Sequence, residues 1–303
     1  MKILVTGGAG FIGKHLVEFL LEKNNVVTIF DNFSNSTKES INGIIKKGAK
    51  IIEGDITKVS DIEKITGDQE IVIHLAAKIS VSESITNPSN TFLVNINGTR
   101  NILEFCEKSK INHIIVASSA AVYGEGNQYT KIIETQKLNP ISPYGESKMK
   151  MEQEIEKFVK NKNLTCTILR FFNIYGLNQS DEYAGVISKF LKKANQKEDL
   201  EIFGDGLQTR DFVSINDVVN SINNAVELKK SGIYNIATGE SISIKKLAEK
   251  IINISRKDLK VLYFNPKNNE IKFSQASIES SKKDLKYMPK VNLDKGIKEL
   301  LEN

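Results

Sequence analysis

The sequence predicts an α/β protein built on a doubly wound parallel sheet, followed by a smaller C-terminal α+β lobe. Through the first two-thirds of the 303 residues, short apolar runs rich in β-branched residues alternate with patterns of helical period. Such apolar runs are typical of parallel strands that are covered on both faces. A glycine-rich turn follows the first run, and after Asn173 the alternation breaks up into mixed short elements.

The expected elements follow from these patterns in chain order. In the first part, strands are predicted at Lys2–Thr6, Val26–Phe30, Ala49–Glu53, Ile71–Leu75, Asn112–Ser118 and Leu164–Phe171. Helices are predicted between them at Phe11–Lys23, Val59–Ile65, Thr91–Ser109 and Pro143–Lys160. In the second part, we expect helices Val186–Asn195, Ile215–Leu228 and Ile244–Ile252 and strands Leu200–Phe203, Gly232–Ile236 and Lys260–Tyr263. We assign residues 1–172, joined by parts of 212–238, to the sheet domain and residues 173–303 mainly to the smaller lobe.

Composition narrows the function classes. The formal charge of +5 comes from scattered lysines with no dense block, which argues against nucleic-acid binding but suits an anionic small substrate. Cys106 and Cys166 both lie in apolar stretches, so we expect free thiols in a reducing compartment. The chain starts directly with a strand pattern and has no apolar run of membrane-spanning length, so we expect a cytoplasmic protein without membrane association. The three histidines show no metal-ligand spacing, and no metal is expected.

The turn after the first strand carries Gly7, Gly10 and Gly13 in G-x-x-G-x-x-G spacing. Glycine allows a tight turn, a close approach of backbone amides to a pyrophosphate, and close packing of helix on strand. The helix that opens at Phe11 would direct its positive N-terminus at the phosphates. This pattern predicts a Rossmann-type dinucleotide site, the alternative being a turn with a structural role only.

The ends of the next strands indicate which dinucleotide is bound. Asp31 ends the second strand about twenty residues later, where a carboxylate can accept from a ribose 2′-hydroxyl and would repel a 2′-phosphate. Asp55 and Ile56 offer a polar contact and an apolar face to an adenine. Ala76 and Ala77 are small enough to leave room for a nicotinamide. We therefore predict NAD as the cofactor.

A Tyr-x-x-x-Lys pair stands at Tyr144 and Lys148, but this motif alone carries no weight. The chain has 42 lysines and arginines and eight tyrosines, so about one copy is expected by chance, and a second copy occurs at Tyr263 and Lys267. The second copy contains Pro266, which cannot lie inside a helix. It therefore lacks the one-turn geometry of a helical pair.

The first copy has a helical context. Ser142 is a good N-cap and Pro143 suits a first helical turn, so Tyr144 and Lys148 should share one helix face. A phenol has a pKa near 10, and an ammonium at about 4 Å contributes roughly 4 kcal/mol at an effective dielectric near 20, or about 3 pKa units. Tyr144 would then act as general base, with Ser119 at the end of the fifth strand sharing the hydrogen bond. The alternative is a packed tyrosine beside a solvated lysine.

Eleven segments in order resemble the extended short-chain dehydrogenase/reductase family, specifically its NAD-dependent nucleotide-sugar epimerases of the UDP-glucose 4-epimerase type. They cover nearly the whole chain: TGGAGFIG, DNFSNS, GDIT, HLAA, NINGTRNILEFC, SSAAVYG, YGESK, LRFFNIYG, GDGLQTRDFVSINDV, YNIATGE and KVNLDKGIKEL. The resemblance implies that the smaller lobe binds the substrate, a UDP-sugar.

The resemblance also extends the expected site. Asn32, Asn35 and Ser36 would join Asp31 around the adenosine ribose, and Asn95 would help to hold the cofactor. The expected cofactor contacts are Gly7, Gly10, Phe11, Ile12, Gly13, Asp31, Asn32, Asn35, Ser36, Asp55, Ile56, Leu75, Ala76, Ala77, Asn95, Ser118, Tyr144, Lys148 and Phe171. The expected catalytic residues are Ser119, Tyr144 and Lys148, and the expected substrate contacts are Ser119, Tyr144, Asn173, Val186, Arg210 and Lys267.

Arginine is rare in this chain, and its planar fork suits phosphate, so Arg210 is the strongest candidate for the substrate's diphosphate. Arg100 and Arg170 are expected to form structural ion pairs. Relatives place a second phosphate-binding arginine in an R-P-G-[DE]-I-like stretch. Here the stretch begins with Lys267, which supplies charge without the fork.

The reaction expected from the resemblance is epimerisation at C4 through a 4-keto intermediate. The related dehydratases and decarboxylases carry acidic residues after the fifth strand, where this chain has Ala120 and Ala121. UDP-glucose, UDP-GlcNAc and UDP-glucuronate stay open as substrates, and the small Ser274 is compatible with an N-acetyl group. A 4-ketoreductase, a dehydratase and a non-catalytic NAD-binding protein are the alternatives.

The resemblance further implies a homodimer. Relatives pair the two helices that correspond to Thr91–Ser109 and Pro143–Lys160 in a four-helix bundle. The alternative is that the apolar faces of both helices are filled by the protein's own sheet.

Overall fold

A computed structural model describes the chain except residues 67, 161, 180–184, 267–269 and 303. A seven-stranded parallel sheet forms its larger part, in the order β10-β6-β5-β4-β1-β2-β3. The strands are β1 (Lys2–Thr6), β2 (Val26–Asp31), β3 (Lys50–Glu53), β4 (Ile71–His74), β5 (His113–Ser119), β6 (Thr165–Phe171) and β10 (Gly232–Ile236). The predicted doubly wound sheet is confirmed, and the strand order reverses between β1 and β4, where such sheets bind ligands.

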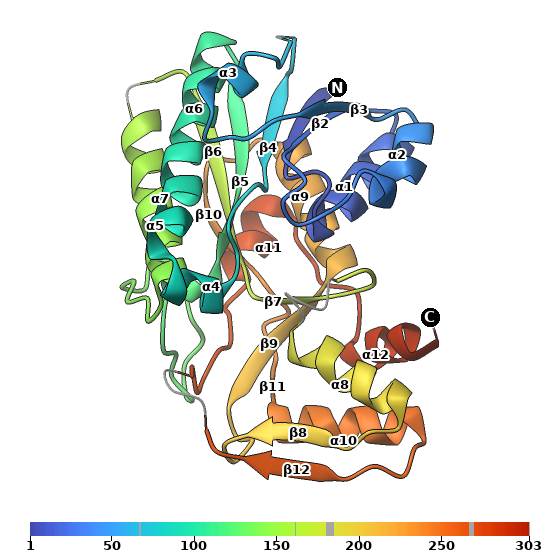
Figure 1. The fold of residues 1–303 in the computed structure, drawn as a ribbon. Coiled ribbons are helices and arrows are strands. Elements are labelled where there is room, and N and C mark those ends of the chain that lie inside the picture. Colours follow the sequence, from blue (N-terminus) through green and yellow to red (C-terminus); the bar gives the residue numbers. More distant parts are fainter. Residues whose placement is uncertain (67, 161, 180–184, 267–269, 303) are drawn as a thin grey trace.

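Helices cover both faces of this sheet (Figure 1). One face carries α1 (Phe11–Glu22), α2 (Asn42–Lys46), α9 (Ile215–Leu228) and α11 (Glu279–Leu285), and the other carries α3 (Val59–Ile62), α6 (Thr99–Lys108) and α7 (Pro143–Val159). Along β1, Ile3 and Val5 enter the core under α1, whereas Leu4 enters the core under α6 and α7. The continuous apolar runs in the sequence thus have the predicted cause, because alternate residues are buried on opposite faces.

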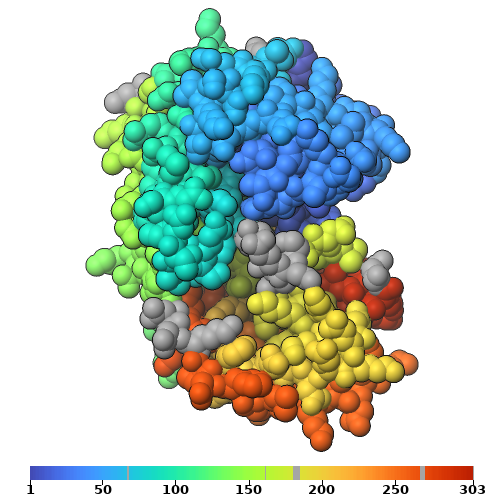
Figure 2. Space-filling view, in the orientation of Figure 1, coloured from blue at the N-terminus to red at the C-terminus, as the bar shows by residue number. Residues whose placement is uncertain are grey.

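The smaller lobe holds two short sheets. One is built from β7 (Asn173–Tyr175), β9 (Thr209–Ser214) and β11 (Ser241–Ser243), and the other pairs β8 (Leu200–Phe203) with β12 (Val261–Phe264). Helices α8 (Val186–Gln196), α10 (Ile244–Ser255) and α12 (Leu293–Glu302) complete its core. Figure 2 shows this lobe, yellow to red, below the blue-to-green sheet domain. The chain returns to the large sheet through α9 and β10. Helix α9 packs on α1, and β10 pairs with β6.

The structure corrects one predicted helix. Instead of one helix over Thr91–Ser109, the chain forms α5 (Pro88–Phe92), a π-helical turn (Leu93–Gly98) and α6. Asn95 lies in this turn and is fully buried, where its amide accepts from the Lys78 backbone N–H (2.8 Å) and donates to the Lys78 carbonyl (2.9 Å). A π-turn redirects a helical side chain in this way, and such turns often occur at functional sites.

Shorter elements complete the description. They are α4 (Val81–Thr86) and three-residue 3₁₀ turns at Glu39–Ile41 and Ala120–Val122. None of the helices in the described part of the chain is long and apolar enough to cross a membrane.

Candidate active site

A cavity of about 450 Å³ lies at the carboxyl ends of the strands of the sheet domain. It is lined by every residue predicted to contact the cofactor except Asn95, and also by Ser119 and Asn173. Asn95 lies behind the wall and holds Lys78, which itself lines the cavity. Residues far apart in the sequence thus meet where the sheet topology predicts a ligand site.

The glycine turn fits a pyrophosphate. Gly7 has a φ of +69°, and a Cβ on it would lie 2.6 Å from the backbone nitrogen of Ala76. A Cβ on Gly13 would lie 2.3 Å from the carbonyl oxygen of Gly7, so α1 begins in direct contact with the turn. This close packing keeps the N-terminus of a 12-residue helix at the cavity wall, where its free amides can bind phosphate oxygens.

The end of β2 fits a ribose. The Asp31 carboxylate accepts from the backbone N–H of Ala9 (2.9 Å) and of Phe33 (2.8 Å). Burial raises the pKa of Asp31, and these two hydrogen bonds oppose the rise. Each carboxylate oxygen keeps acceptor capacity for a hydroxyl. Beside it, Asn32 donates to Asp55 (3.1 Å), and both side chains line the cavity.

The catalytic candidates meet at the other end of the cavity. Helix α7 begins as predicted, because Ser142 caps it by accepting from the Gly145 N–H (3.1 Å) and Pro143 occupies the first turn. Tyr144 and Lys148 both face the cavity from this helix. Ser119 forms a hydrogen bond with Tyr144 from the end of β5.

The electrostatics of this group differ from the prediction. Burial raises the pKa of Tyr144, and the hydrogen bond from Ser119 only opposes that rise. Burial also lowers the pKa of Lys148 to about 8, against the charge of Glu152. The Lys148 ammonium donates to the Ala117 carbonyl at 3.0 Å. The predicted lowering of the Tyr144 pKa by Lys148 is therefore not found, because burial has the largest effect on this pKa and raises it.

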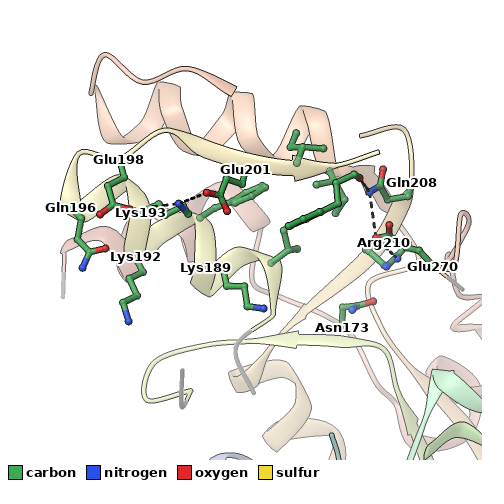
Figure 3. A pocket seen from close by; sticks show the side chains of 15 residues that line it. Asn173, Lys189, Lys192, Lys193, Gln196, Glu198, Glu201, Gln208, Arg210 and Glu270 are labelled. Atoms are coloured by element: carbon green, nitrogen blue, oxygen red, sulfur yellow. Dashed lines mark hydrogen bonds and ion pairs between the residues drawn. The ribbon is translucent and has the colours of Figure 1, made fainter. Parts of the chain in front are cut away.

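A second cavity of about 440 Å³ lies in the smaller lobe and is lined by Arg210 and Asn173 (Figure 3). Val186 also lines it. Arg210 reaches it from β9, donates to the Thr209 carbonyl (2.8 Å) and forms an ion pair with Glu270 (3.6 Å). Burial lowers the pKa of Arg210. Asn173 lines both cavities, so the two adjoin. Lys267, the remaining predicted substrate contact, lies outside the described residues.

Comparison with known proteins gives the family. The model of the NAD-dependent epimerase/dehydratase family matches residues 3–237. This chain belongs to that family. A Methanocaldococcus jannaschii protein provisionally named UDP-glucose 4-epimerase is 40% identical over 303 residues, covering 99% of this chain and 97% of its own length.

Solved structures agree with this assignment. The UDP-glucose 4-epimerase of Thermotoga maritima, solved with UDP-glucose, has a TM-score of 0.94 and 34% identity, covering 100% of this chain and 98% of that one. The UDP-N-acetylglucosamine 4-epimerase of Methanobrevibacter ruminantium, in complex with UDP-N-acetylmuramic acid, has a TM-score of 0.93 and 33% identity, with coverage of 99% and 97%. NAD is the cofactor of this family, and the glycine turn, Asp31 and the sheet-edge cavity fit it.

Several residues that line the cavities were not predicted from the sequence. In the second cavity these are chiefly Lys189 on α8 and Phe203, Gln208 and Glu270. The helical period of α8 marked an amphipathic helix but not which polar side chains face a ligand. Ser274, by contrast, is buried and lines neither cavity. Within the described ranges, no group of three or more His, Cys, Asp or Glu side chains gathers to hold a metal.

Proposed function

We propose that this protein interconverts the C4 epimers of a UDP-hexose, with Tyr144 as the acid–base residue. The observation that carries the proposal is the convergence of Ser119, Tyr144 and Lys148 on one cavity that also contains the dinucleotide-binding turn. Ala120 and Ala121, which follow Ser119 directly, offer no further acid or base. A site with one proton-transfer residue suits a reversible oxidation better than loss of water or carbon dioxide.

Each residue then has one task. Tyr144 takes the proton of the C4 hydroxyl while Ser119 hydrogen-bonds the same oxygen. NAD, held at the glycine turn and Asp31, would supply the hydride-transfer chemistry at C4. The resulting 4-ketone must turn over between the two transfers, and Tyr144 then gives its proton back. Lys148 stabilises the tyrosinate while its ammonium is charged.

The second cavity supports a nucleoside diphosphate as the handle of the substrate. Arg210 presents a guanidinium whose fork matches phosphate oxygens, and Asn173 adds an amide where the two cavities meet. Within the protein itself, Glu270 is the ion-pair partner of this buried guanidinium. Lys189 reaches toward the same opening from α8 and adds a second cation (Figure 3).

The sugar is either the UDP-glucose/UDP-galactose or the UDP-GlcNAc/UDP-GalNAc pair, with UDP-glucuronate as the alternative. Because Ser274 is buried and lines neither cavity, its compatibility with an N-acetyl group does not help to choose the sugar. The deciding experiment incubates the purified protein with each of the three nucleotide sugars and resolves the products by NMR. Failure to form a C4 epimer from any of them would defeat the proposal.

Tyr144→Phe tests the role of the base separately. It removes only the hydroxyl, so turnover should be lost while bound NAD is retained. A Phe variant with wild-type activity would show that Tyr144 is not the base.

The homodimer belongs to the same proposal, and the structure changes the argument for it. Leu103, Phe105 and Ile155 are buried in the chain's own core, which leaves partly exposed positions on α5–α7 such as Leu93 (46% exposed) to pack against a second copy. Light scattering at micromolar concentration should give the mass of a dimer. Cytoplasmic location stays a prediction from Cys106 and Cys166, which are free and buried.

A further inference from the structure

A buried ion pair lies directly behind the catalytic group. Glu152 follows Tyr144 and Lys148 at the same four-residue spacing on α7, and its carboxylate is 2% exposed. Arg170 on β6 clamps it from the facing strand, with its Nε at 3.0 Å from Oε1 and its Nη2 at 2.6 Å from Oε2. Such a pair is costly to desolvate and is weak evidence for stability, so another role has to be considered.

The last three residues of β5 form hydrogen bonds, one each, with Tyr144, Lys148 and Glu152 of α7. The Ala117 carbonyl accepts from Lys148 (3.0 Å), the Ser118 hydroxyl donates to Glu152 (2.5 Å), and the Ser119 hydroxyl bonds Tyr144. Three successive strand residues are thus each tied to one of three helix residues spaced four apart. The tie through Glu152 is further anchored to a third element, β6, by Arg170.

The Arg170 side of the clamp is also fixed. Its Nη1 donates to the Tyr123 hydroxyl (2.8 Å) and to the Glu134 carbonyl (2.9 Å), and Tyr123 donates to Asn235 on β10 (2.6 Å). Arg170 was expected to form a structural ion pair, and the pair is confirmed. Arg170 thus connects β6 to α7 through Glu152 and to β10 through Tyr123 and Asn235, so it can hold the reacting group in position.

The charges that face Lys148 are few. On its own helix they are Glu152 and, when ionised, Tyr144; from β4 comes His74, whose pKa is lowered to about 3 by burial and by the lysine's charge, so it is neutral. On β6, Arg170 is already paired with Glu152, and burial raises the pKa of the Cys166 thiol, which is neutral. Apart from an ionised Tyr144, Glu152 is the group in this set that attracts the ammonium.

We propose that Glu152, held by Arg170, is a positioning residue for the reaction: it fixes the Ser119–Tyr144–Lys148 geometry and supplies the negative charge that keeps Lys148 protonated. This rests on the proposed function for its kinetic readout. Glu152 touches neither cavity and acts only through Lys148 and Ser118.

The test compares turnover against pH in wild type, Glu152→Gln and the charge-balanced double variant Glu152→Gln/Arg170→Met. Without the carboxylate the pKa of Lys148 falls, so the pH above which kcat declines should move down by about 1–3 units, with little change in KM. The double variant leaves no unpaired arginine and protects the fold against the loss of one partner. Glu154→Gln is the matched control, since it removes an arginine-paired carboxylate from the outer face of the same helix.

A purely structural role would lower kcat equally at all pH values. If the folded double variant keeps the wild-type pH profile, the proposal is wrong. Should neither variant fold, nitrogen NMR of the lysine side chains in the wild-type protein decides, because a Lys148 that is neutral at pH 7 overturns the proposal and a charged one supports it. That measurement needs no turnover, so it stands even if no UDP-sugar is converted and the proposed function fails.

Discussion

Gly13→Ala is the sharpest perturbation of the cofactor site, because the structure gives its cost directly. The new Cβ would lie 2.3 Å from the Gly7 carbonyl oxygen and 2.6 Å from the Gly8 Cα. The three nearest atoms are all backbone, so no side-chain rotation relieves the contact. Helix α1 would have to move on the order of 1 Å away from the turn to restore van der Waals distance.

The expected cost follows from two opposing effects. Overpacking of this kind costs about 1–3 kcal/mol, whereas replacing a helical glycine by alanine gains about 0.5–1 kcal/mol. Gly43→Ala in α2 isolates the second effect, because a Cβ there meets nothing within 4 Å. We therefore expect Gly13→Ala to unfold more easily than wild type and Gly43→Ala less easily.

The assay is urea unfolding of both variants after removal of NAD, so that ligand binding does not contribute to the free energy of unfolding. NAD retained by the purified proteins is measured separately and should drop only in Gly13→Ala, since the helix N-terminus moves off the pyrophosphate. If Gly13→Ala is as stable as Gly43→Ala and retains as much NAD as wild type, then the pyrophosphate site does not depend on the close packing of α1 on the glycine turn.

Three further predictions concern the two cavities. Arg210→Lys keeps the charge but loses the fork, so the KM for the UDP-sugar should rise about tenfold with kcat nearly unchanged; a fall in kcat alone would contradict this. Asp31→Asn should weaken NAD binding by roughly tenfold in calorimetry, because one charge-assisted hydrogen bond is lost, and equal affinity would exclude the ribose contact. Turnover should decline above about pH 8, where Lys148 loses its proton and its support of the tyrosinate; a rate that stays constant to pH 10 would contradict that role.

The local parts of the cofactor site were predictable from sequence. The glycine turn and Asp31 sit at the ends of strands that the apolar runs identify, and the sheet rules then place them together. The break at Leu93–Gly98 was not predictable from helical periodicity, because it is set by the contact of Asn95 with Lys78, seventeen residues away. Tertiary hydrogen bonds decide such a turn, and local propensity does not record them.

The substrate side was harder for the same reason. Its cavity lies between α8, β8 and β9, and β8 pairs with β12 some sixty residues later in the chain. Arg210 was found through its rarity and the family resemblance. Glu270 and Phe203 carried no signal of comparable strength, because acidic and aromatic residues occur throughout the chain.

The acidity of Tyr144 shows why the surroundings of the tyrosine–lysine pair matter more than its spacing. The pKa of a phenol has to fall by about 3 units, equivalent to roughly 4 kcal/mol, before the group can act as a base near pH 7. Burial works against that drop at Tyr144, and Ser119 offsets only part of it. The remainder has to come from positive charge, and Lys148 supplies it only while it stays protonated in a site that lowers its own pKa to about 8. The tyrosine thus depends on the lysine and the lysine on a counter-charge, so the active unit of α7 extends from Tyr144 to Glu152.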